Sequence, residues 1–391
     1  MKFCIVLSRM QYFVMYMISL YTPLSIFLYL PNIQVIHNTF TTSAGMEFTL
    51  FLYGASFGYI CWGLFIQNYD SVKALYLSQL ILICALIGNM RVTTSFWFCI
   101  FRFIQGFAIS ASRIVYTNLF KQFLNDVELQ MAIGNIMLLR VVILATAPFI
   151  GSIIGKKLIV GWKGIFVFQL VYVLLTFILA LRYLRDVPDD TTQYLSFITY
   201  YKQFFYDHLT SKFTLANSLS EGAIGVISAL LTILISKYYK IFPYAFSSTM
   251  FIIMSNVAIL LYINIILSKK TSLQKLLNYN LVQYWFFSVL LFLISYNFHP
   301  LHYVITIWFV SILISSLLVI AFCSNVCVLQ YTTASNYLST FIGVSEVVVG
   351  SLMTLVSSFF SVNNITSFTF SLVLLFLAVF MIYVYLVVND V

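Results

Sequence analysis

Five charged side chains lie well inside apolar stretches of this chain, where a charge needs a physical reason. They are Arg102, Arg113, Arg140, Glu221 and Glu346. A guanidinium at the centre of a bilayer costs about 2.5–3.5 kcal/mol on insertion scales, so such groups face a polar interior or pair with one another. A carboxylate that has lost its water takes up a proton more readily, unless an arginine partner opposes this. These residues therefore predict charge pairing and proton uptake along a polar pathway through a membrane.

The spacing of these residues places some of them on a shared helix face. Arg102 and Arg113 are eleven residues apart, three helical turns plus about 20°, so they share one face about 16 Å from each other, with Gly106 close to it. Glu221 and Glu346 fall near the middle of their apolar segments. The arginines lie in the first half of the chain and the glutamates in the second. This division fits a zwitterionic solute held between the halves, or ion pairs across them. The alternative is that these groups only hold helices together.

The composition indicates that lipid is the solvent of this chain. Of 391 residues, 62% are hydrophobic and 8% are charged, whereas soluble proteins carry about 25% charged residues. The net charge of +9 is scattered through short loops, which fits anionic lipid and excludes a nucleic-acid-binding face. The six cysteines lie within or beside apolar runs, away from histidines and acids. We therefore expect neither a metal site nor a disulfide framework.

Apolar segments recur along the chain at lengths that suit a bilayer, because about 20 helical residues cross its hydrocarbon core. We predict twelve spans, near residues 11–30, 46–66, 74–90, 94–118, 129–155, 162–182, 212–236, 246–267, 281–297, 302–325, 337–360 and 365–388. The polar residues 183–211 divide them into an N-terminal six-helix bundle, residues 1–182, and a C-terminal one, residues 212–391. The predicted fold class is all-α integral membrane. The bias of basic residues makes the linker and both termini cytoplasmic.

Short motifs in the N-terminal half resemble those of the major facilitator superfamily, and within it those of the Bcr/CflA drug:proton antiporters. The resemblance covers about residues 20–170 and rests on Pro23-Leu24-Ser25-Ile26, Tyr29-Leu30-Pro31, Gly54, Gly58, Gly63, Arg102-Phe103-Ile104-Gln105-Gly106, Ala147-Pro148 with Gly155, and Gly161-Trp162. It implies the major facilitator fold, two bundles that rock around a mid-membrane site. It also implies that the helix of Arg102 lines the central cavity, where its cationic face attracts an anionic or zwitterionic solute.

The glycines and the proline of these motifs predict close helix packing. Gly54 and Gly58 let helix backbones approach each other, because packing drives helix association in lipid. Pro148 removes a backbone hydrogen bond and bends its helix. With Gly155 it marks a flexible or closely packed segment.

Two positions depart from the family pattern. In the superfamily, a loop acid four residues after the glycine that corresponds to Gly63 anchors a cytoplasmic gate, and here Gln67 takes its place. Asp70 and Lys73 are the remaining candidates for a gate charge pair. Bcr-like antiporters carry an acid in the first span, where this chain has Phe27. Proton coupling therefore does not carry over at that position, and Glu221 or Glu346 becomes the candidate proton carrier.

These residues together predict a secondary active transporter that moves a small organic solute by alternating access. Proton-coupled efflux of drug-like compounds follows from the resemblance. The altered gate, the missing acid and the added arginines favour an alternative, an uptake carrier or facilitator for a charged or zwitterionic metabolite. A further alternative is a membrane sensor that has lost transport.

Other classes of protein lack support in the sequence. The chain has no GxGxxG, P-loop, HExxH or GxSxG arrangement, so we expect no enzyme. We also expect no cofactor, with a proton gradient as the energy source. The expected partners are the small-molecule solute and the lipid bilayer. The expected setting is the plasma membrane, a bacterial inner membrane, which holds the chain as a multi-pass monomer.

Overall fold

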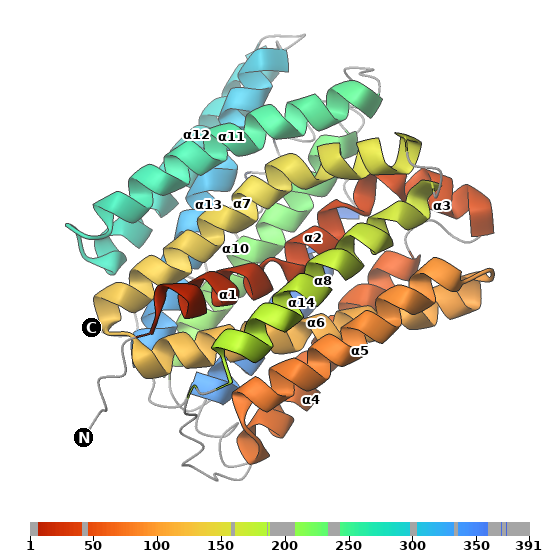
Figure 1. The fold of residues 1–391 in the computed structure, drawn as a ribbon. Helices are drawn as coiled ribbons and strands as arrows, with labels where there is room; N and C mark the ends of the chain where they lie inside the picture. Colours follow the sequence, from red (N-terminus) through yellow and green to blue (C-terminus); the bar gives the residue numbers. More distant parts are fainter. Residues whose placement is uncertain are drawn as a thin grey trace. The chain divides into compact units, whose positions relative to one another are not determined.

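A computed structural model describes residues 7–40, 46–157, 161–185, 187, 208–233, 243–297, 303–331, 335–358, 369 and 373. In these residues every regular element is a helix, as the composition predicts (Figure 1). The α-helices are α1 (Arg9–Ser19), α2 (Tyr21–Phe27), α3 (Ile33–Phe40), α4 (Met46–Asn68), α5 (Ser71–Arg91), α6 (Ser95–Phe123), α7 (Asp126–Lys157), α8 (Gly164–Tyr183), α10 (His208–Ile233), α11 (Pro243–Leu267), α12 (Leu273–Asn297), α13 (Tyr303–Tyr331) and α14 (Ser335–Ser358). Two short 3-10 helices, η1 (Leu30–Asn32) and η2 (Gly161–Lys163), precede α3 and α8.

Eight helices of the described part are long and apolar enough to cross a membrane. They are α4 to α8 and α11 to α13, at the places of the second to sixth and the eighth to tenth predicted spans. The seventh and eleventh predicted spans are helical as α10 and α14 but are not among the eight. The twelfth, residues 365–388, lies outside the described residues apart from positions 369 and 373, and so do residues 188–207 of the predicted linker.

The first predicted span, residues 11–30, is divided in the structure. The α-helix stops at Ser19, turns at Leu20 and resumes as α2 from Tyr21. Pro23 accounts for the break, because a proline has no N–H to donate to the carbonyl four residues earlier and its ring crowds that carbonyl. A capping box starts α1, in which Ser8 and Gln11 exchange side-chain-to-backbone hydrogen bonds.

Two compact units are present. The first comprises residues 1–132, 146–203 and 333–344, and the second comprises residues 133–145, 204–332 and 345–391. Helices α7 and α14 therefore each contribute to both units. The predicted bundle boundaries at residues 182 and 212 fall in or beside the undescribed segment and stay a prediction.

The first unit is built around α6, which packs against α4 and α5. Gly54 and Gly106 bring α4 and α6 into backbone contact. A Cβ on Gly54 would lie 2.0 Å from the carbonyl oxygen of Phe103, and a Cβ on Gly106 would lie 2.0 Å from that of Phe51. Gly58 meets the backbone of Phe107 in the same way, at 2.5 Å. This crossing fixes the part of α6 that carries Arg102.

The second unit is built around α13, whose middle residues are almost all buried and which packs against α10, α11 and α12. Helix α10 also approaches α14 closely. A Cβ on Gly222 would lie 2.8 Å from the sulfur of Met353 and 3.1 Å from the Cα of Gly350. The small residues at this contact place polar groups of α10 and α14 next to each other.

Candidate functional site

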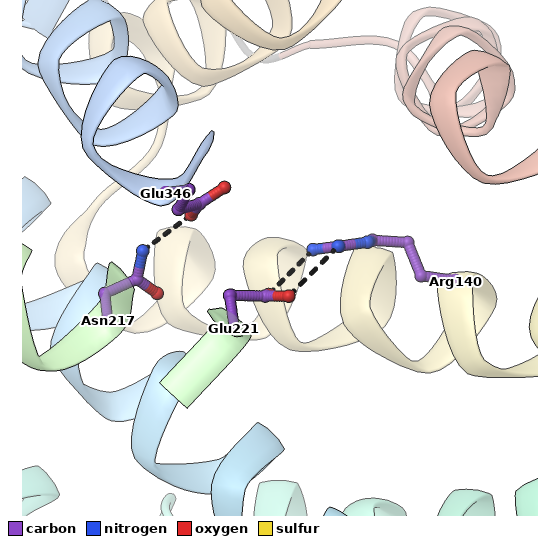
Figure 2. Close-up of polar contacts among 4 residues, drawn as sticks. All are labelled: Arg140, Asn217, Glu221 and Glu346. Carbon is purple, nitrogen blue, oxygen red and sulfur yellow. Dashed lines mark hydrogen bonds and ion pairs between the residues drawn. The ribbon is translucent and has the colours of Figure 1, made fainter. Parts of the chain in front are cut away.

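An ion pair joins α7 to α10 inside the second unit. The Arg140 guanidinium donates to the Glu221 carboxylate at 3.2 Å (Nη1 to Oε1) and 3.5 Å (Nη2 to Oε2), so both oxygens are engaged (Figure 2). The side chains are 31% and 15% exposed, respectively. Arginine binds carboxylates well in this two-point geometry because its N–H groups match the two oxygens. The ion pair is thus formed and partly buried, and part of each side chain remains exposed.

The second carboxylate lies beside this pair. Asn217, one turn before Glu221 on α10, donates through Nδ2 to Oε1 of Glu346 on α14 at 2.6 Å (Figure 2). Ser218 and Ser345 form a further hydrogen bond of 2.7 Å between the same helices. Asn217 is 1% exposed, and its Oδ1 is without a hydrogen-bond partner among the described residues. The site therefore keeps one buried acceptor available beside two carboxylates.

Three of the charges predicted from sequence thus gather in one place: Arg140, Glu221 and Glu346. We define them, with Asn217, as the charged cluster. The sequence did not identify Asn217 as the hydrogen-bond partner of Glu346. Its spacing of four from Glu221 is the signal that could have found it, because residues four apart share a helix face.

The other two arginines lie in the first unit, on α6. Arg113 is half-buried. Arg102 has no exposed surface, and its guanidinium carbon lies 4.3 Å from the ring centre of Tyr29 and 4.7 Å from that of Phe51. Both contacts are in the range of a cation–π interaction. In this structure Arg102 is therefore enclosed by protein and is not on an open cavity wall.

Gln105 connects Arg102 to three other helices. Its Oε1 accepts from Arg102 at 3.0 Å and from Asn89 of α5 at 3.2 Å. Its Nε2 donates to Ser25 of α2 at 3.2 Å and to Gln169 of α8 at 2.9 Å. A displacement of the Arg102 guanidinium would therefore reach α2, α5 and α8 through a single side chain.

Glu47 is a buried acid that is not among the residues predicted from sequence. It lies in the first turn of α4, is 1% exposed, and interacts electrostatically with both Arg102 and Tyr29. Position 47 is the second residue of a predicted span, where an acid resembles an ordinary helix-start or headgroup residue. The signal that could have found it is Arg102 itself, because a buried guanidinium requires an anion or several acceptors.

The residues around the predicted gate have local structural roles. Gly63 of α4 packs against the side chain of Thr340, to which a Cβ would come within 2.2 Å. The side chain of Gln67 lies outside the described residues, and Lys73 is exposed on the first turn of α5. Asp70 is the N-cap of α5, and its Oδ1 accepts from the backbone N–H of Val72 at 2.8 Å. The structure thus gives Asp70 a helix-capping contact.

Removing this cap is expected to cost stability. Asp70→Ala should destabilise the protein by about 1 kcal/mol, whereas Asp70→Asn should be near neutral because asparagine also caps well. Thermal unfolding of the two purified variants measures the difference. Equal losses of stability in both variants would contradict the capping role. Asparagine keeps the capping oxygen and removes only the charge, so the effect would then come from the charge.

The proline–glycine segment of α7 packs against the end of the first predicted span. The helix runs through Pro148 without interruption. A Cβ added to Gly151 would lie 2.4 Å from the carbonyl oxygen of Leu28. A Cβ added to Gly155 would lie 1.9 Å from Oδ1 of Asn32. Asn32 also donates to the carbonyl of Gly151 at 2.9 Å. Close contact with the backbone of Leu28 therefore accounts for glycine at position 151, and close contact with the side chain of Asn32 accounts for it at position 155.

Metal-binding groups are not found among the residues that the structure describes: no three His, Cys, Asp or Glu side chains gather there to hold an ion. The charged cluster itself presents an ion pair between Arg140 and Glu221, with the carboxylate of Glu346 beside it.

Comparison with known proteins gives one family and several similar folds. The family model described as Major Facilitator Superfamily matches residues 12–345. Among solved structures, the E. coli fucose:proton symporter FucP is 14% identical with a TM-score of 0.72, and the match covers 95% of this chain and 96% of that one. The human organic anion transporter MFSD10 (TETRAN) is 11% identical with a TM-score of 0.70, over 96% of this chain and 99% of that one.

A bacterial homologue of the iron transporter ferroportin, in the outward-facing state, is 11% identical with a TM-score of 0.74, over 98% of this chain and 100% of that one. No curated protein matches this chain. At these identities the solved structures show the fold and nothing finer.

Proposed function

The chain belongs to the major facilitator superfamily, and from this we propose that it is a proton-coupled secondary transporter that carries a small organic solute by alternating access. The observation that supports the proposal is the Arg140–Glu221 ion pair beside Glu346. Arg140 is the fifteenth of 32 residues in α7, Glu221 the fourteenth of 26 in α10, and Glu346 the twelfth of 24 in α14. Charges halfway along membrane helices are costly and mark solute or ion pathways.

Opening of the ion pair is the proposed binding step. While Glu221 is ionised it occupies the Arg140 guanidinium. A proton on Glu221, or an anionic group on the solute, separates the two and leaves the other partner free to bind. Protonation of Glu221 and binding of an anionic group to Arg140 thereby favour each other, and such linkage between two ligands is what coupling of their movements requires.

The direction and the cargo are proposed from the N-terminal motifs. Their resemblance to the Bcr/CflA antiporters supports export of drug-like compounds, with proton entry as the driving force. We place the protein in the plasma membrane of a bacterium, as a monomer with both termini in the cytoplasm. The excess of basic residues on the side of the termini supports this orientation.

A second candidate function is a carrier for charged or zwitterionic metabolites. The ion pair itself favours it, because Arg140 and Glu221 offer opposite charges to the two ends of a zwitterion such as an amino acid. Such a carrier would exchange amino acids and would not transport organic cations. A drug exporter would do the reverse.

Counterflow in proteoliposomes tests the proposal and separates the two candidates. The purified chain is reconstituted with an unlabelled probe inside, and uptake of the same labelled probe is followed for amino acids, organic anions and the cation ethidium. We expect the trapped probe to accelerate uptake for one class, because only alternating access permits such exchange. Absence of exchange for every class, with monodisperse protein, would favour the non-transporting sensor.

A further inference from the structure

A small buried cavity of the first unit is lined by residues of α2, α5 and α8. Its volume is about 10 Å³, and of the described residues that line it, all but Tyr172 are at most 6% exposed. A water molecule needs about 10–15 Å³ of such space and two to four polar partners. The cavity therefore has the room of a single water molecule, and its polar lining decides whether it binds one.

The direction of the hydrogen bonds beside this cavity is fixed by Arg102. A guanidinium only donates, so the atom of Gln105 that binds Arg102 at 3.0 Å must be its carbonyl oxygen, Oε1. The amide nitrogen of Gln105 then donates to Ser25 at 3.2 Å and to Gln169 at 2.9 Å. Gln169 must accept with its own Oε1. Its amide nitrogen is therefore left to find another partner.

The amide nitrogen of Gln169 is a buried donor beside the cavity. Gln169 lines the cavity and is 4% exposed, and its Nε2 has no hydrogen-bond partner among the described residues. Ser25 lines the same cavity and is also 4% exposed. Its oxygen accepts from Gln105, and in the described part of the chain no acceptor binds its hydroxyl hydrogen. Because a buried donor is costly to leave unpaired, these two side chains require an acceptor.

We infer that this cavity binds one water molecule, whose oxygen accepts from Nε2 of Gln169 and from the hydroxyl of Ser25. Tyr21 is a third polar residue of the lining, and its hydroxyl oxygen can accept a hydrogen of the water. The inference goes beyond the proposed function and does not depend on it, because the site lies in the first unit, apart from the charged cluster.

The lining favours water over the other candidate ligands. The open groups of Gln169 and Ser25 are donors, so a cation is unfavourable beside them. A bare anion would lose its hydration against the apolar part of the wall, which is formed by Leu24, Leu82, Leu86 and Val173. An organic solute is larger than about 10 Å³. A neutral molecule of the smallest size that accepts and donates hydrogen bonds is therefore the ligand that fits.

The bound water closes a ring of hydrogen bonds between three helices. The ring runs from Gln105 of α6 to Ser25 of α2, through the water to Gln169 of α8, and back to Gln105. Helix α2 has only seven residues, and a helix of this length has little stability of its own. The water thereby helps to hold the second part of the divided first span against α6 and α8.

A crystallographic or cryo-electron-microscopy map of the purified full-length protein, at a resolution that shows ordered water, tests the site directly. We expect a density peak at hydrogen-bond distance, about 2.7–3.2 Å, from both Nε2 of Gln169 and Oγ of Ser25. The absence of a peak between these two atoms, in a map that shows water at other buried positions, would overturn the inference.

The sign of a cavity-filling substitution is a second test. Val173→Ile adds one carbon beside the cavity. If this carbon displaces a bound water, Gln169 loses its acceptor and the midpoint of thermal unfolding should fall by a few degrees. If the cavity is dry, filling it should raise the midpoint.

Gln169→Met provides the matched background for this test, because methionine keeps the length of the side chain and has no N–H to satisfy. Val173→Ile should lower the unfolding midpoint in the wild-type background and cause no comparable fall in Gln169→Met. A rise in the wild-type background would overturn the inference. Equal falls in both backgrounds would also overturn it, because they would trace the loss to overpacking. Neither experiment involves a solute, so failure here would leave the proposed transport function unaffected.

Discussion

Gly106→Val is expected to separate α4 from α6 and to destabilise the protein by about 3 kcal/mol, the upper end of the range for overpacking. The obstructing atom is the backbone oxygen of Phe51, 2.0 Å from the position of a Cβ, and a helix backbone cannot rotate away as a side chain can. Gly54→Val meets the carbonyl of Phe103 in the same way and should give a similar loss. The measurement is the midpoint of thermal unfolding of the purified protein in detergent.

A glycine in open space is the matched control for this prediction. Gly225 lies inside α10, and a Cβ added to it would have no atom of another residue within 4 Å beyond its own helix turn, among the residues that the structure describes. Gly225→Ala should therefore be neutral or stabilising by up to about 1 kcal/mol, because alanine is the better helix former. Equal unfolding midpoints for Gly106→Val and Gly225→Ala would refute the close crossing of α4 and α6.

Arg140→Gln is expected to reduce solute exchange about ten- to hundredfold, since a hydrogen bond to a charged group contributes about 1.5–3 kcal/mol and each 1.4 kcal/mol is a factor of about ten. Glu221 would keep its charge and lose the guanidinium that lies 3.2 Å away. Glu221→Gln, which mimics the protonated carboxyl, should lose proton-driven transport and keep exchange. Initial rates of counterflow with the probe that exchanges in the wild type measure both variants.

The double variant Arg140→Gln/Glu221→Gln separates stability from transport. It removes both charges, so it should unfold at a higher temperature than either single variant, because no unpaired charge remains. It should still fail to exchange, because neither group can then bind the solute or a proton. Arg91→Gln, which removes an exposed arginine at the end of α5, is the control and should exchange normally. Wild-type exchange in the double variant would exclude the pair from the transport site.

The sequence predicts the class and family of this protein better than its polar contacts. An apolar composition with few charges is compatible only with a membrane protein, and the match to the major facilitator superfamily confirms that level of the prediction. Finer family membership depends on a few motif positions, several of which differ here. The Bcr/CflA relationship therefore stays a proposal.

Polar contacts are harder to predict because they depend on which helix faces meet. Arg140 and Glu221 are each recognisable as costly charges, but they are 81 residues apart, and no spacing rule pairs residues on separate helices. The family pattern places the gate acid at position 67, where this chain has Gln67, so Asp70 is only a candidate substitute. Its observed contact is a local cap of α5. Glu47 escapes prediction because its burial arises from the packing of α4 on α6, which the glycines suggest only in outline.

The charged cluster lies within the second unit, offers both signs of charge and keeps part of its surface exposed. Solute binding is therefore the proposed task of the second unit.

Internal pH during solute movement tests the central claim, that this chain couples a solute to protons, most directly. Proteoliposomes that contain the wild-type protein and a trapped pH-sensitive dye receive, from outside, a solute that has exchanged in counterflow. Coupling predicts a prompt change of internal pH, alkaline for antiport and acidic for symport, that is absent from protein-free liposomes. Solute entry with no change of internal pH would contradict the account.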